Sequence, residues 1–492
     1  MGDAGVNRVV AWLSLWMVLL AGGCASFVVP DTQPLPKAFL APPGAMSISK
    51  GGYRVAALPP HPEAPDLLVL VAMSGGGKRS SSFGYGALQG MRDVMLPTAQ
   101  GPVSLLSQLS GISGVSGGSF PAAYYGLYRD AAFGKFEQDF LYQDTNAYIY
   151  GIYLLPWNWT WLVDPVVGTN DFMDQVYEKT MFHGATFADL QARGRPIIAI
   201  GATDVSYGTP FLMTQENFDL ICADLGQFPI ARAVAASNGF PGLFSPVTLT
   251  SHTPDCEGRK PGWLRYVTKA QLNNPRSRVR QQVTDAGHYL DPDQTAYLHL
   301  VDGGVSDNLA LRAAGGMMVA GAQDIGDTPF SNLRRILVIS VDGEGAQDTS
   351  VARRKSVGGL FSLFGLVTGN QIDRSNFDTL ALLSDQLQTL QTAIIKARCA
   401  HGPSLNGVAC DDVQAQLLHL SLAGRPPGPE TSKLLAIPTG LTIDRGDVDL
   451  LIQAGRDAVT GSEDLRAFLA AYYPPVPAPK VTAPKPGTVA AK

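Results

Sequence analysis

The stretch Leu67-Leu68-Val69-Leu70-Val71-Ala72-Met73-Ser74-Gly75-Gly76-Gly77-Lys78-Arg79 decides the fold. Its first seven residues form an unbroken apolar run, which is typical of a parallel strand that is buried on both faces. Three glycines come shortly after it, and residues 80–94 then have the spacing of a helix. A buried strand that runs through a glycine turn into a helix predicts an α/β protein.

The same alternation continues along the chain. Further strands are predicted at 105–110, 196–202, 211–214, 298–301 and 336–341, and further helices at 120–129 and 375–397. The strands at 196–202 and 211–214 are expected to form a hairpin. Apolar residues at helical spacing indicate that 375–397 is a long amphipathic helix covering the sheet. The sequence therefore predicts a mainly parallel sheet flanked by helices on both faces.

Composition narrows the class of protein. The chain has 492 residues, enough for one large α/β domain with a packed core. It carries 37 basic and 42 acidic residues without a basic block, so nothing in it suggests a nucleic-acid-binding surface. Only 16% of the residues are charged, and 53 glycines and 35 prolines indicate many loops rather than a disordered chain.

The N-terminus is typical of an export signal. Arg8 is a short basic region, and residues 9–20 are apolar but too few to span a bilayer comfortably. The segment ends in Ala21-Gly22-Gly23-Cys24, which resembles the cleavage box of bacterial lipoproteins, with Cys24 as the lipidated residue. We expect a lipoprotein anchored in a membrane of the bacterial cell envelope and facing the periplasm. An ordinary signal peptide cleaved near Ala25 and a buried anchor helix are the alternatives.

Four more cysteines follow, at Cys222, Cys256, Cys399 and Cys410. An even number in an exported chain suggests two disulfides. Sequential pairing, Cys222 with Cys256 and Cys399 with Cys410, closes the shortest loops. The alternative is four free thiols buried in the core.

Gly114-Val115-Ser116-Gly117-Gly118 is the only Gly-x-Ser-x-Gly pattern in the chain. Small residues on both sides permit the strained strand-to-helix turn that lifts a serine hydroxyl out of a sheet. The turn also places backbone N–H groups at a helix N-terminus, where a negative oxygen is stabilised. Ser116 is thus a candidate nucleophile. Ser113 competes with it but fits less well, because Val115 stands where the second glycine is needed.

Two further motifs carry candidate chemistry. The glycines at 75–77 let bare N–H groups point at one spot and so predict an anion-binding loop. A nucleotide loop is the weaker alternative, because neither glycine spacing for phosphate binding is met. Arg79 either buttresses this loop or is a surface charge. Asp302-Gly303-Gly304 ends a predicted strand, where α/β proteins bind ligands, although a tight Asp-Gly turn would look the same.

In this order, the three motifs resemble the patatin-like phospholipase family, whose pattern is Gly-Gly-Gly-x-Arg/Lys, Gly-x-Ser-x-Gly and Asp-Gly-Gly/Ala. Residues 235–246, which read AASNGFPGLFSP, and residues 302–309, which read DGGVSDNL, also resemble blocks of this family. The resemblance covers about residues 67–345. Ser80 stands where the family usually has Gly or Ala, which leaves the detailed shape of the glycine loop open.

The resemblance implies a serine–aspartate pair on an α/β sheet, with no histidine base, no metal and no cofactor. By position, Ser116 is the nucleophile, Asp302 is the general base, and the amides of Gly75, Gly76 and Gly77 form the oxyanion hole. The expected activity is hydrolysis of carboxylic esters in membrane lipids or related acyl esters through an acyl-enzyme. The expected partners are this lipid substrate and the membrane surface, reached through the lipid anchor. Protein partners are left unassigned.

Two rival functions remain open. One is an α/β-hydrolase with a Ser-Asp-His triad, whose histidine would be His401 or His419. The other is a lipid-binding envelope protein on an inactive hydrolase fold. The aromatic-rich residues 148–161 are either an interfacial lid or part of the core and pocket wall. None of the seven histidines has the His-x-x-x-His spacing of a metal site.

The expected organisation has five parts. They are a signal peptide at 1–23, a lipid anchor and Pro/Ala-rich tether at 24–62, a patatin-like catalytic domain at 63–345, a helical extension packed on it at 346–473, and a flexible Pro/Ala/Lys tail at 474–492.

Overall fold

The computed structural model describes residues 29–40, 51–54, 61, 64, 66–98, 101–159, 167–312, 332–345, 349–356, 360–405 and 407–472. The predicted signal peptide, Cys24, the C-terminal tail and the last residues of the aromatic segment therefore lie outside the described residues.

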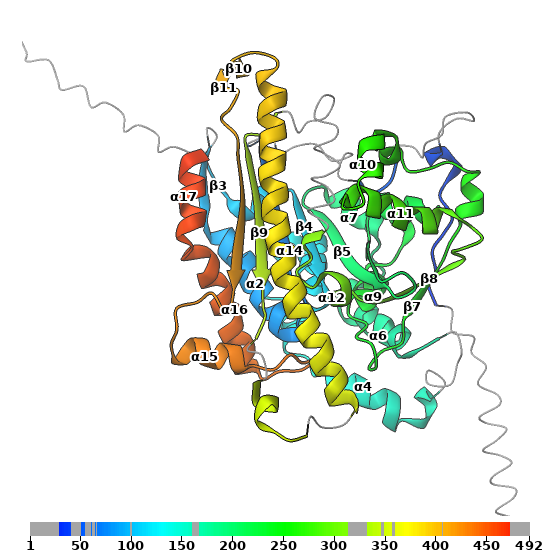
Figure 1. Ribbon diagram of the computed structural model, residues 1–492. Helices are drawn as coiled ribbons and strands as arrows, with labels where there is room; N and C mark the ends of the chain where they lie inside the picture. Colours follow the sequence, from blue (N-terminus) through cyan, green and yellow to red (C-terminus); the bar gives the residue numbers. More distant parts are fainter. Residues whose placement is uncertain are drawn as a thin grey trace, which may run out of the picture.

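Eight strands form one central sheet, in the order β12-β9-β1-β4-β5-β8-β7 with β6 paired to β5 (Figure 1). Their bounds are β1 Leu67–Met73, β4 Gly111–Val115, β5 Ile197–Asp204, β6 Thr209–Leu212, β7 Val247–Thr250, β8 Tyr297–Asp302, β9 Arg335–Asp342 and β12 Gln414–Ser421. The five strands from β12 to β5 are parallel, whereas β6, β7 and β8 join in antiparallel pairs. The predicted mainly parallel sheet is confirmed.

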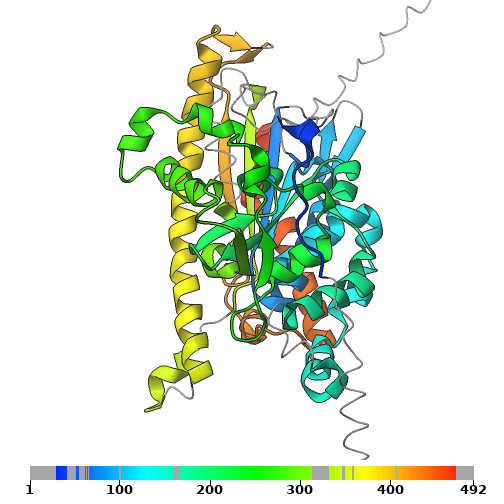
Figure 2. The ribbon, with the colours of Figure 1, turned by 90° about the vertical axis from the view of Figure 1, so that its right-hand side faces the viewer.

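Helices cover both faces of this sheet, as predicted (Figures 1 and 2). On one face lies α14 (Leu360–Cys399), the long yellow helix. On the other lie α2 (Gly77–Asp93), α3 (Ser119–Tyr128), α9 (Ile230–Ser237) and α16 (Arg445–Thr460). Strand β1 shows why two layers form: Leu70 and Ala72 belong to the core under α14, whereas Val69, Val71 and Met73 belong to the core under α2.

The other α-helices are α4 Thr145–Leu154, α6 Thr169–Tyr177, α7 Phe187–Arg193, α8 Gln215–Phe218, α10 Lys269–Asn273, α11 Arg278–Leu290, α12 Gly304–Asp307, α15 Pro429–Ala436 and α17 Glu463–Tyr472. Two small hairpins are β2 Met95–Thr98 with β3 Gly101–Ser104, and β10 Ser404–Leu405 with β11 Val408–Ala409. No helix among the described residues combines the length and the apolar character needed to cross a bilayer.

One predicted strand is misplaced. Residues 105–110 were expected to be a strand, but Leu105–Gln108 forms a short 3-10 helix and the strand β4 occupies Gly111–Val115. The sequence of β4, Gly-Ile-Ser-Gly-Val, has low strand propensity and therefore reads as a loop. Pairing with β1 on one side and β5 on the other holds it in the sheet.

The predicted helical extension at 346–473 also contains a strand, β12, which adds a parallel edge to the sheet through β9. Its helix α16 packs closely on α2, because two glycines face the partner's backbone. A Cβ on Gly86 would lie 2.7 Å from the carbonyl carbon of Ile452, and one on Gly455 would lie 2.9 Å from the amide of Ala87. The C-terminal part is therefore built into the same sheet and core as the predicted catalytic domain.

The described pieces of the predicted tether are docked on the domain. Thr32 donates a hydrogen bond to the carbonyl of Thr250 at 2.6 Å, and the Leu35 amide donates to the carbonyl of Cys222 at 2.8 Å. Tyr53 is fully buried, and its hydroxyl accepts the amide of Ile198 at 2.6 Å. These segments are predicted to be a tether, but a free linker would have neither paired backbone groups nor a buried tyrosine. The described pieces therefore do not behave as a tether.

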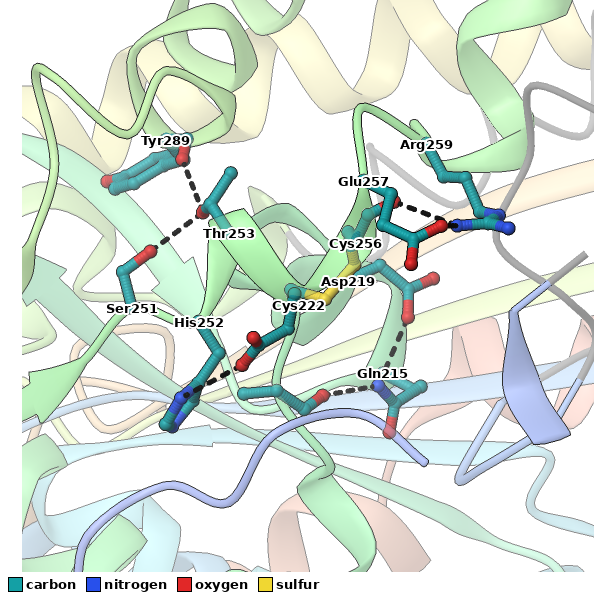
Figure 3. Close-up of a disulfide and its surroundings, with 12 residues drawn as sticks. Gln215, Asp219, Cys222, Ser251, His252, Thr253, Cys256, Glu257, Arg259 and Tyr289 are labelled. Atoms are coloured by element: carbon teal, nitrogen blue, oxygen red, sulfur yellow. Dashed lines mark hydrogen bonds and ion pairs between the residues drawn. A yellow bond between two sulfur atoms is a disulfide. The ribbon is translucent and has the colours of Figure 1, made fainter. Parts of the chain in front are cut away.

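Both predicted disulfides are confirmed. Cys222–Cys256 joins the turn after α8 to the segment after β7, and Cys399–Cys410 ties the end of α14 to the chain before β12. Figure 3 shows the first of them, with the Gln215 side chain directed at Asp219 beside it. These links fasten the periphery of the sheet rather than the region around Ser116.

Candidate active site

Ser116 lies at a sharp turn between β4 and α3. It has a φ of 50°, a left-handed conformation that is rare for residues other than glycine. Neighbouring hydrogen bonds hold it there: its amide donates to the Ser237 hydroxyl at 2.9 Å, and the Ser119 hydroxyl donates to its carbonyl at 2.6 Å. The Ser237 hydroxyl in turn donates to the carbonyl of Gly201 on β5 at 2.6 Å. The strained turn expected of a nucleophile elbow is therefore present.

The hydroxyl of Ser116 contacts Asp302 directly. Its Oγ donates to Asp302 Oδ2 at 2.7 Å, and the other carboxylate oxygen accepts the amide of Gly304 at 2.7 Å. Both side chains are largely buried, with 8% of Ser116 and 6% of Asp302 exposed. The direct contact leaves no room for a histidine ring between the two.

Asp302 reaches Ser116 from an antiparallel strand. The sequence placed this residue at the end of a strand, and β8, which ends at Asp302, runs antiparallel to β5. Val115 of β4 pairs with Gly201 of β5. The next residue of β5, Ala202, pairs with Asp302 of β8. Strand β5 continues past the end of β4, so the antiparallel β8 ends beside the elbow. The predicted strand end at Asp302 is therefore confirmed.

Burial sets the acidity of Asp302. It raises the pKa of this carboxyl to about 6, against the opposing effect of hydrogen bonds from Ser116 and from the Gly304 amide. At neutral pH the group is therefore largely ionised, and it is a stronger base than an exposed aspartate. A carboxylate of this kind can accept a proton from the serine hydroxyl it touches.

The glycine loop lies against the elbow. A Cβ on Gly117 would lie 2.7 Å from the amide nitrogen of Gly77, so only glycine allows this approach. The Gly75 amide donates to the carbonyl of Asn308 at 2.8 Å and is not free for a ligand, unlike the prediction. Within the described ranges, the amides of Gly76 and Gly77 have no such acceptor. These two remain as candidate oxyanion donors.

Arg79 buttresses the loop, which resolves the two options left by the sequence. Its guanidinium donates from Nε to the carbonyl of Gly343 at 2.7 Å and from Nη1 to that of Ile437 at 2.9 Å. Ser80, the departure from the family pattern, donates its hydroxyl to the Gly75 carbonyl at 2.5 Å. The loop is thus fastened from within and from the C-terminal part of the chain.

Ser237 and Asn238 are site residues to which the sequence assigned no role. Besides the Ser237 contacts above, the Asn238 side chain lies 3.4 Å from Ser116 Oγ through Oδ1 and 3.3 Å from the Tyr177 hydroxyl through Nδ2. Ser237 is the last residue of α9 and Asn238 follows it, in the block at 235–246. Two polar residues at the end of an Ala-rich helix were the available signal.

The other candidates lie elsewhere. His419 on β12 contacts Ser340 Oγ at 3.2 Å, and His401 contacts the carbonyl of Ala397 at 2.9 Å. Neither histidine touches Ser116 or Asp302, so the triad alternative has no histidine in place. The hydroxyl of Ser113 is buried and donates to the carbonyl of Ala310 at 2.7 Å. In the described part of the chain, no three His, Cys, Asp or Glu side chains gather as a metal site requires.

A small cavity of about 10 Å³, enough for one water molecule, lies beside Asn238, whose side chain contacts Ser116 Oγ. Its lining residues are Gly77, Lys78, Phe120, Phe140, Thr145, Tyr177, Asn238 and Leu441. The rings of Phe120 and Phe140 stack with centroids 4.1 Å apart, which gives the cavity an apolar wall. Pockets for drug-sized ligands have roughly 300–1,000 Å³, so a long acyl chain needs this cavity to open further.

Ser116 and Asp302 thus form a buried hydroxyl–carboxylate pair beside the amides of Gly76 and Gly77, on the sheet of an α/β protein. Residues 71–314 match the family model described as Patatin-like phospholipase. The chain belongs to this family of lipid hydrolases.

Among solved structures, the chain is similar to human GIVD cytosolic phospholipase A2, with a TM-score of 0.41 and 13% identity over 83% of this chain and 63% of that one. A complex of this human protein with methyl gamma-linolenyl fluorophosphonate gives a TM-score of 0.37 and 12% identity, over 83% of this chain and 60% of that one. Type III effector protein ExoU gives a TM-score of 0.20 and 16% identity, over 72% of this chain and 77% of that one. The chain thus spans less than two thirds of the human structures. A search of curated proteins finds no match.

Proposed function

We propose that this protein is a serine acyl hydrolase that cleaves carboxylic ester bonds in membrane lipids. Ser116 is the nucleophile and Asp302 the general base. The 2.7 Å hydrogen bond between Ser116 Oγ and Asp302 Oδ2 carries the proposal, because it joins a hydroxyl at a strained elbow to a carboxylate of raised pKa. Family membership supports a lipid as the substrate.

The reaction has two halves. Asp302 accepts the Ser116 proton as Oγ attacks the ester carbonyl carbon, and the amides of Gly76 and Gly77 stabilise the oxyanion. The intermediate collapses to an acyl-serine, and the alcohol leaves with the proton from Asp302. Water then attacks the acyl-serine while Asp302 accepts its proton. The second intermediate releases the carboxylic acid, and Ser116 regains its hydroxyl proton.

A fluorophosphonate probe tests this function. The probe phosphonylates an activated serine, so peptide mapping is expected to find it on Ser116. The labelled and unlabelled proteins are then compared on a panel of phospholipids, lysophospholipids and acylglycerols. Labelling at Ser116 with loss of ester hydrolysis supports the proposal. A folded wild-type protein that takes up no probe and hydrolyses no ester would establish the alternative of an inactive, lipid-binding fold.

Activity is expected to fall in acid because Asp302 must be ionised to accept a proton. Its pKa of about 6 predicts that kcat/KM for an uncharged ester rises with pH through about 6 and then levels off. Below that point the loss approaches tenfold per pH unit. Steady-state kinetics between pH 4.5 and 8 check this. Activity that stays constant down to pH 4.5 would contradict the assigned base.

The surface of α4 supports a lipid interface. Ile149 and Ile152 are buried, whereas Tyr150, Tyr153, Leu154, Leu155 and Trp159 are 37–72% exposed. Residues 145–159 contain no charged side chain, and Thr145 lines the cavity. In both views α4 lies at the end of the molecule opposite the β2–β3 hairpin (Figures 1 and 2). Exposed tyrosine, tryptophan and leucine beside a site favour insertion into a lipid surface.

Leu154→Asp is therefore expected to lower hydrolysis of lipid vesicles about tenfold, because it places a charge on the inserted face. Hydrolysis of a soluble short-chain ester should stay within twofold of wild type. The matched control is Leu272→Asp on α10, an exposed leucine outside this surface. Equal losses on vesicles and on the soluble ester would show that α4 contributes to the fold of the site rather than to membrane contact.

We also propose that the protein is held on the membrane by a lipid at Cys24, as the N-terminal sequence suggests. Mass spectrometry of the mature N-terminus tests this. A processed chain that begins at or after Ala25 without lipid would refute it.

A further inference from the structure

Asn238 is a buried polar residue that contacts the nucleophile. Its side chain is 5% exposed, and its carboxamide lies 3.4 Å from Ser116 Oγ at one end and 3.3 Å from the Tyr177 hydroxyl at the other. The backbone fixes its position, because the Asn238 amide donates to the carbonyls of Val234 and Ala235 at 3.0 and 3.2 Å. The carboxamide is therefore held between two hydroxyl groups and away from solvent.

The residues on either side of Asn238 hold both Ser116 and Asp302. The Ser237 hydroxyl accepts the Ser116 amide at 2.9 Å, and the Gly239 carbonyl accepts the Asp302 amide at 3.0 Å. This three-residue segment is thus bonded to the elbow and to the end of β8 at once. The motion left to the Asn238 side chain is rotation of its carboxamide about the Cβ–Cγ bond.

The number of protons decides which end of the carboxamide faces Ser116. A serine hydroxyl has one proton, and Ser116 donates it to Asp302 Oδ2 at 2.7 Å, so none is left for a second acceptor at 3.4 Å. The Tyr177 hydroxyl keeps its own proton, because burial raises its pKa well above the ordinary value. In the described part of the chain this hydroxyl contacts no polar group except the Asn238 carboxamide. A carboxamide oxygen turned towards Ser116 would therefore meet a hydroxyl whose proton is already committed, and Tyr177 would have no acceptor among the described residues.

The reverse orientation satisfies all four groups. The oxygen and the NH2 group of a carboxamide occupy nearly the same space, so a half-turn exchanges them without moving a neighbour. Oδ1 would then accept the Tyr177 proton, and Nδ2 would donate to a lone pair of Ser116 Oγ. The hydrogen bonds would run in one direction, from Tyr177 through Asn238 and Ser116 to Asp302.

We propose that Asn238 is a further catalytic residue, whose Nδ2 donates to Ser116 Oγ and stabilises the negative charge that this oxygen acquires during the reaction. Tyr177 is its positioning residue. The proposal rests on the proposed function and adds a donor that acts on the nucleophile rather than on the ester carbonyl. Oγ becomes negative as Asp302 accepts its proton, until the bond to the ester carbon forms. It becomes negative again when the acyl-serine breaks down, until Asp302 returns the proton. Asn238 keeps its own protons throughout.

The contact is weak before the reaction and strong during it. A separation of 3.4 Å is long for a hydrogen bond between neutral groups, whereas a charged oxygen draws a donor to about 2.8 Å. An interaction that strengthens only in the transition state raises kcat and leaves substrate binding unchanged. Because water is excluded from this buried contact, the effect should be as large as that of an oxyanion-hole donor.

Asn238→Asp tests the donor with little change of shape. It replaces the NH2 group with a second acceptor beside Ser116, so kcat for a soluble ester should fall about 100-fold or more, with KM within about twofold of wild type. If the carboxamide instead accepted the Ser116 proton, a carboxylate would accept it at least as well, and retained activity would overturn the proposal. Asn217→Asp is the matched control, because its Nδ2 donates to the Leu212 carbonyl and contacts neither Ser116 nor Asp302. Its kcat should stay within about twofold of wild type.

Tyr177→Phe tests the orientation of the carboxamide. Loss of one hydrogen bond that holds Asn238 should lower kcat about fivefold. In the double variant with Asn238→Leu, the loss should be no greater than that of Asn238→Leu alone, because Tyr177 acts through Asn238. Additive losses, or an unchanged kcat in Tyr177→Phe, would overturn the proposed chain of hydrogen bonds. The control is Tyr128→Phe, which removes a hydroxyl bonded to the Met181 carbonyl at 2.6 Å and should lower stability only.

The pH profile separates this role from that of the base. Asn238→Leu should lower kcat/KM at every pH while keeping its rise through about pH 6, since Asp302 still accepts the proton. A purely structural role predicts that the losses of the Asn238 and Tyr177 variants follow their melting temperatures, and that result would overturn the proposal.

The rate of phosphonylation is a second measurement, which needs no turnover. A fluorophosphonate probe reacts with Ser116 Oγ, so Asn238→Leu should slow its second-order rate constant about 100-fold. Wild-type rates for both Asn238 variants would overturn the role of Asn238 and leave the proposed function intact. A wild type that takes up the probe but hydrolyses no ester would overturn the proposed function alone, because the phosphonylation rates still decide the role of Asn238. A wild type that is inert in both assays would overturn both. If neither Asn238 variant folds, the phosphonylation rate of Tyr177→Phe decides.

Discussion

Ser116→Ala is expected to lower kcat/KM for lipid esters by about four orders of magnitude or more, because it removes the atom that forms the acyl-enzyme. The fold should survive, since the bonds that hold the elbow come from the Ser116 backbone and from Ser119 and Ser237. Steady-state hydrolysis and thermal unfolding of the same preparation measure the two effects.

Ser113→Ala is the matched control for that variant. Its hydroxyl points into the core and donates to the carbonyl of Ala310, so its loss should cost some stability and little activity. A fluorophosphonate adduct on Ser113, or an active Ser116→Ala protein, would show that the nucleophile has been assigned to the wrong serine.

Asp302→Asn is expected to be as damaging as Ser116→Ala. An amide has nearly the shape of the carboxylate but cannot accept the hydroxyl proton, so the substitution removes the base and leaves the packing. In the structure no second base contacts Ser116 Oγ, whose described partners are Asp302 and the Asn238 carboxamide. The loss should appear in kcat for both lipid and soluble esters.

Variants of His401 and His419 are the controls for this prediction. His401→Ala and His419→Ala should each retain most of the wild-type activity, because their rings contact Ala397 and Ser340 rather than Ser116 or Asp302. A triad histidine would instead cost about as much as the serine itself. A severe loss of kcat in either histidine variant, with an unchanged melting temperature, would contradict the dyad and support a Ser-Asp-His triad.

The sequence was most informative where local rules and tertiary structure agree. The apolar run at 67–73 had to be removed from water, and it forms the buried strand β1. The two disulfides followed from counting cysteines and choosing short loops. The positions of Ser116 and Asp302 followed from motifs whose glycines are needed for close backbone approach.

Non-local pairing explains what the sequence could not reveal. Gly111–Val115 is a strand only because β1 and β5 hold it on both sides, and β8 runs antiparallel without any local mark of its direction. The Gly75 amide is occupied by a carbonyl from Asn308, which is more than 200 residues away in the chain. The contact of Asn238 with Tyr177 likewise joins the end of α9 to α6, which are far apart in the chain.

The contacts between the glycine loop and the C-terminal part of the chain determine when the site can form during synthesis. The family model ends at residue 314, yet β9 lies between β1 and β12, and the loop is bound to the backbone of Gly343, Ile437 and Gly440. A ribosome that has made only the first two thirds of the chain has produced the serine and the aspartate, but not the carbonyls that fix the loop. The newly made protein therefore acquires a complete site only when its last third has emerged and folded. Until then, the chain carries Ser116 and Asp302 without the contacts that hold the glycine loop beside them.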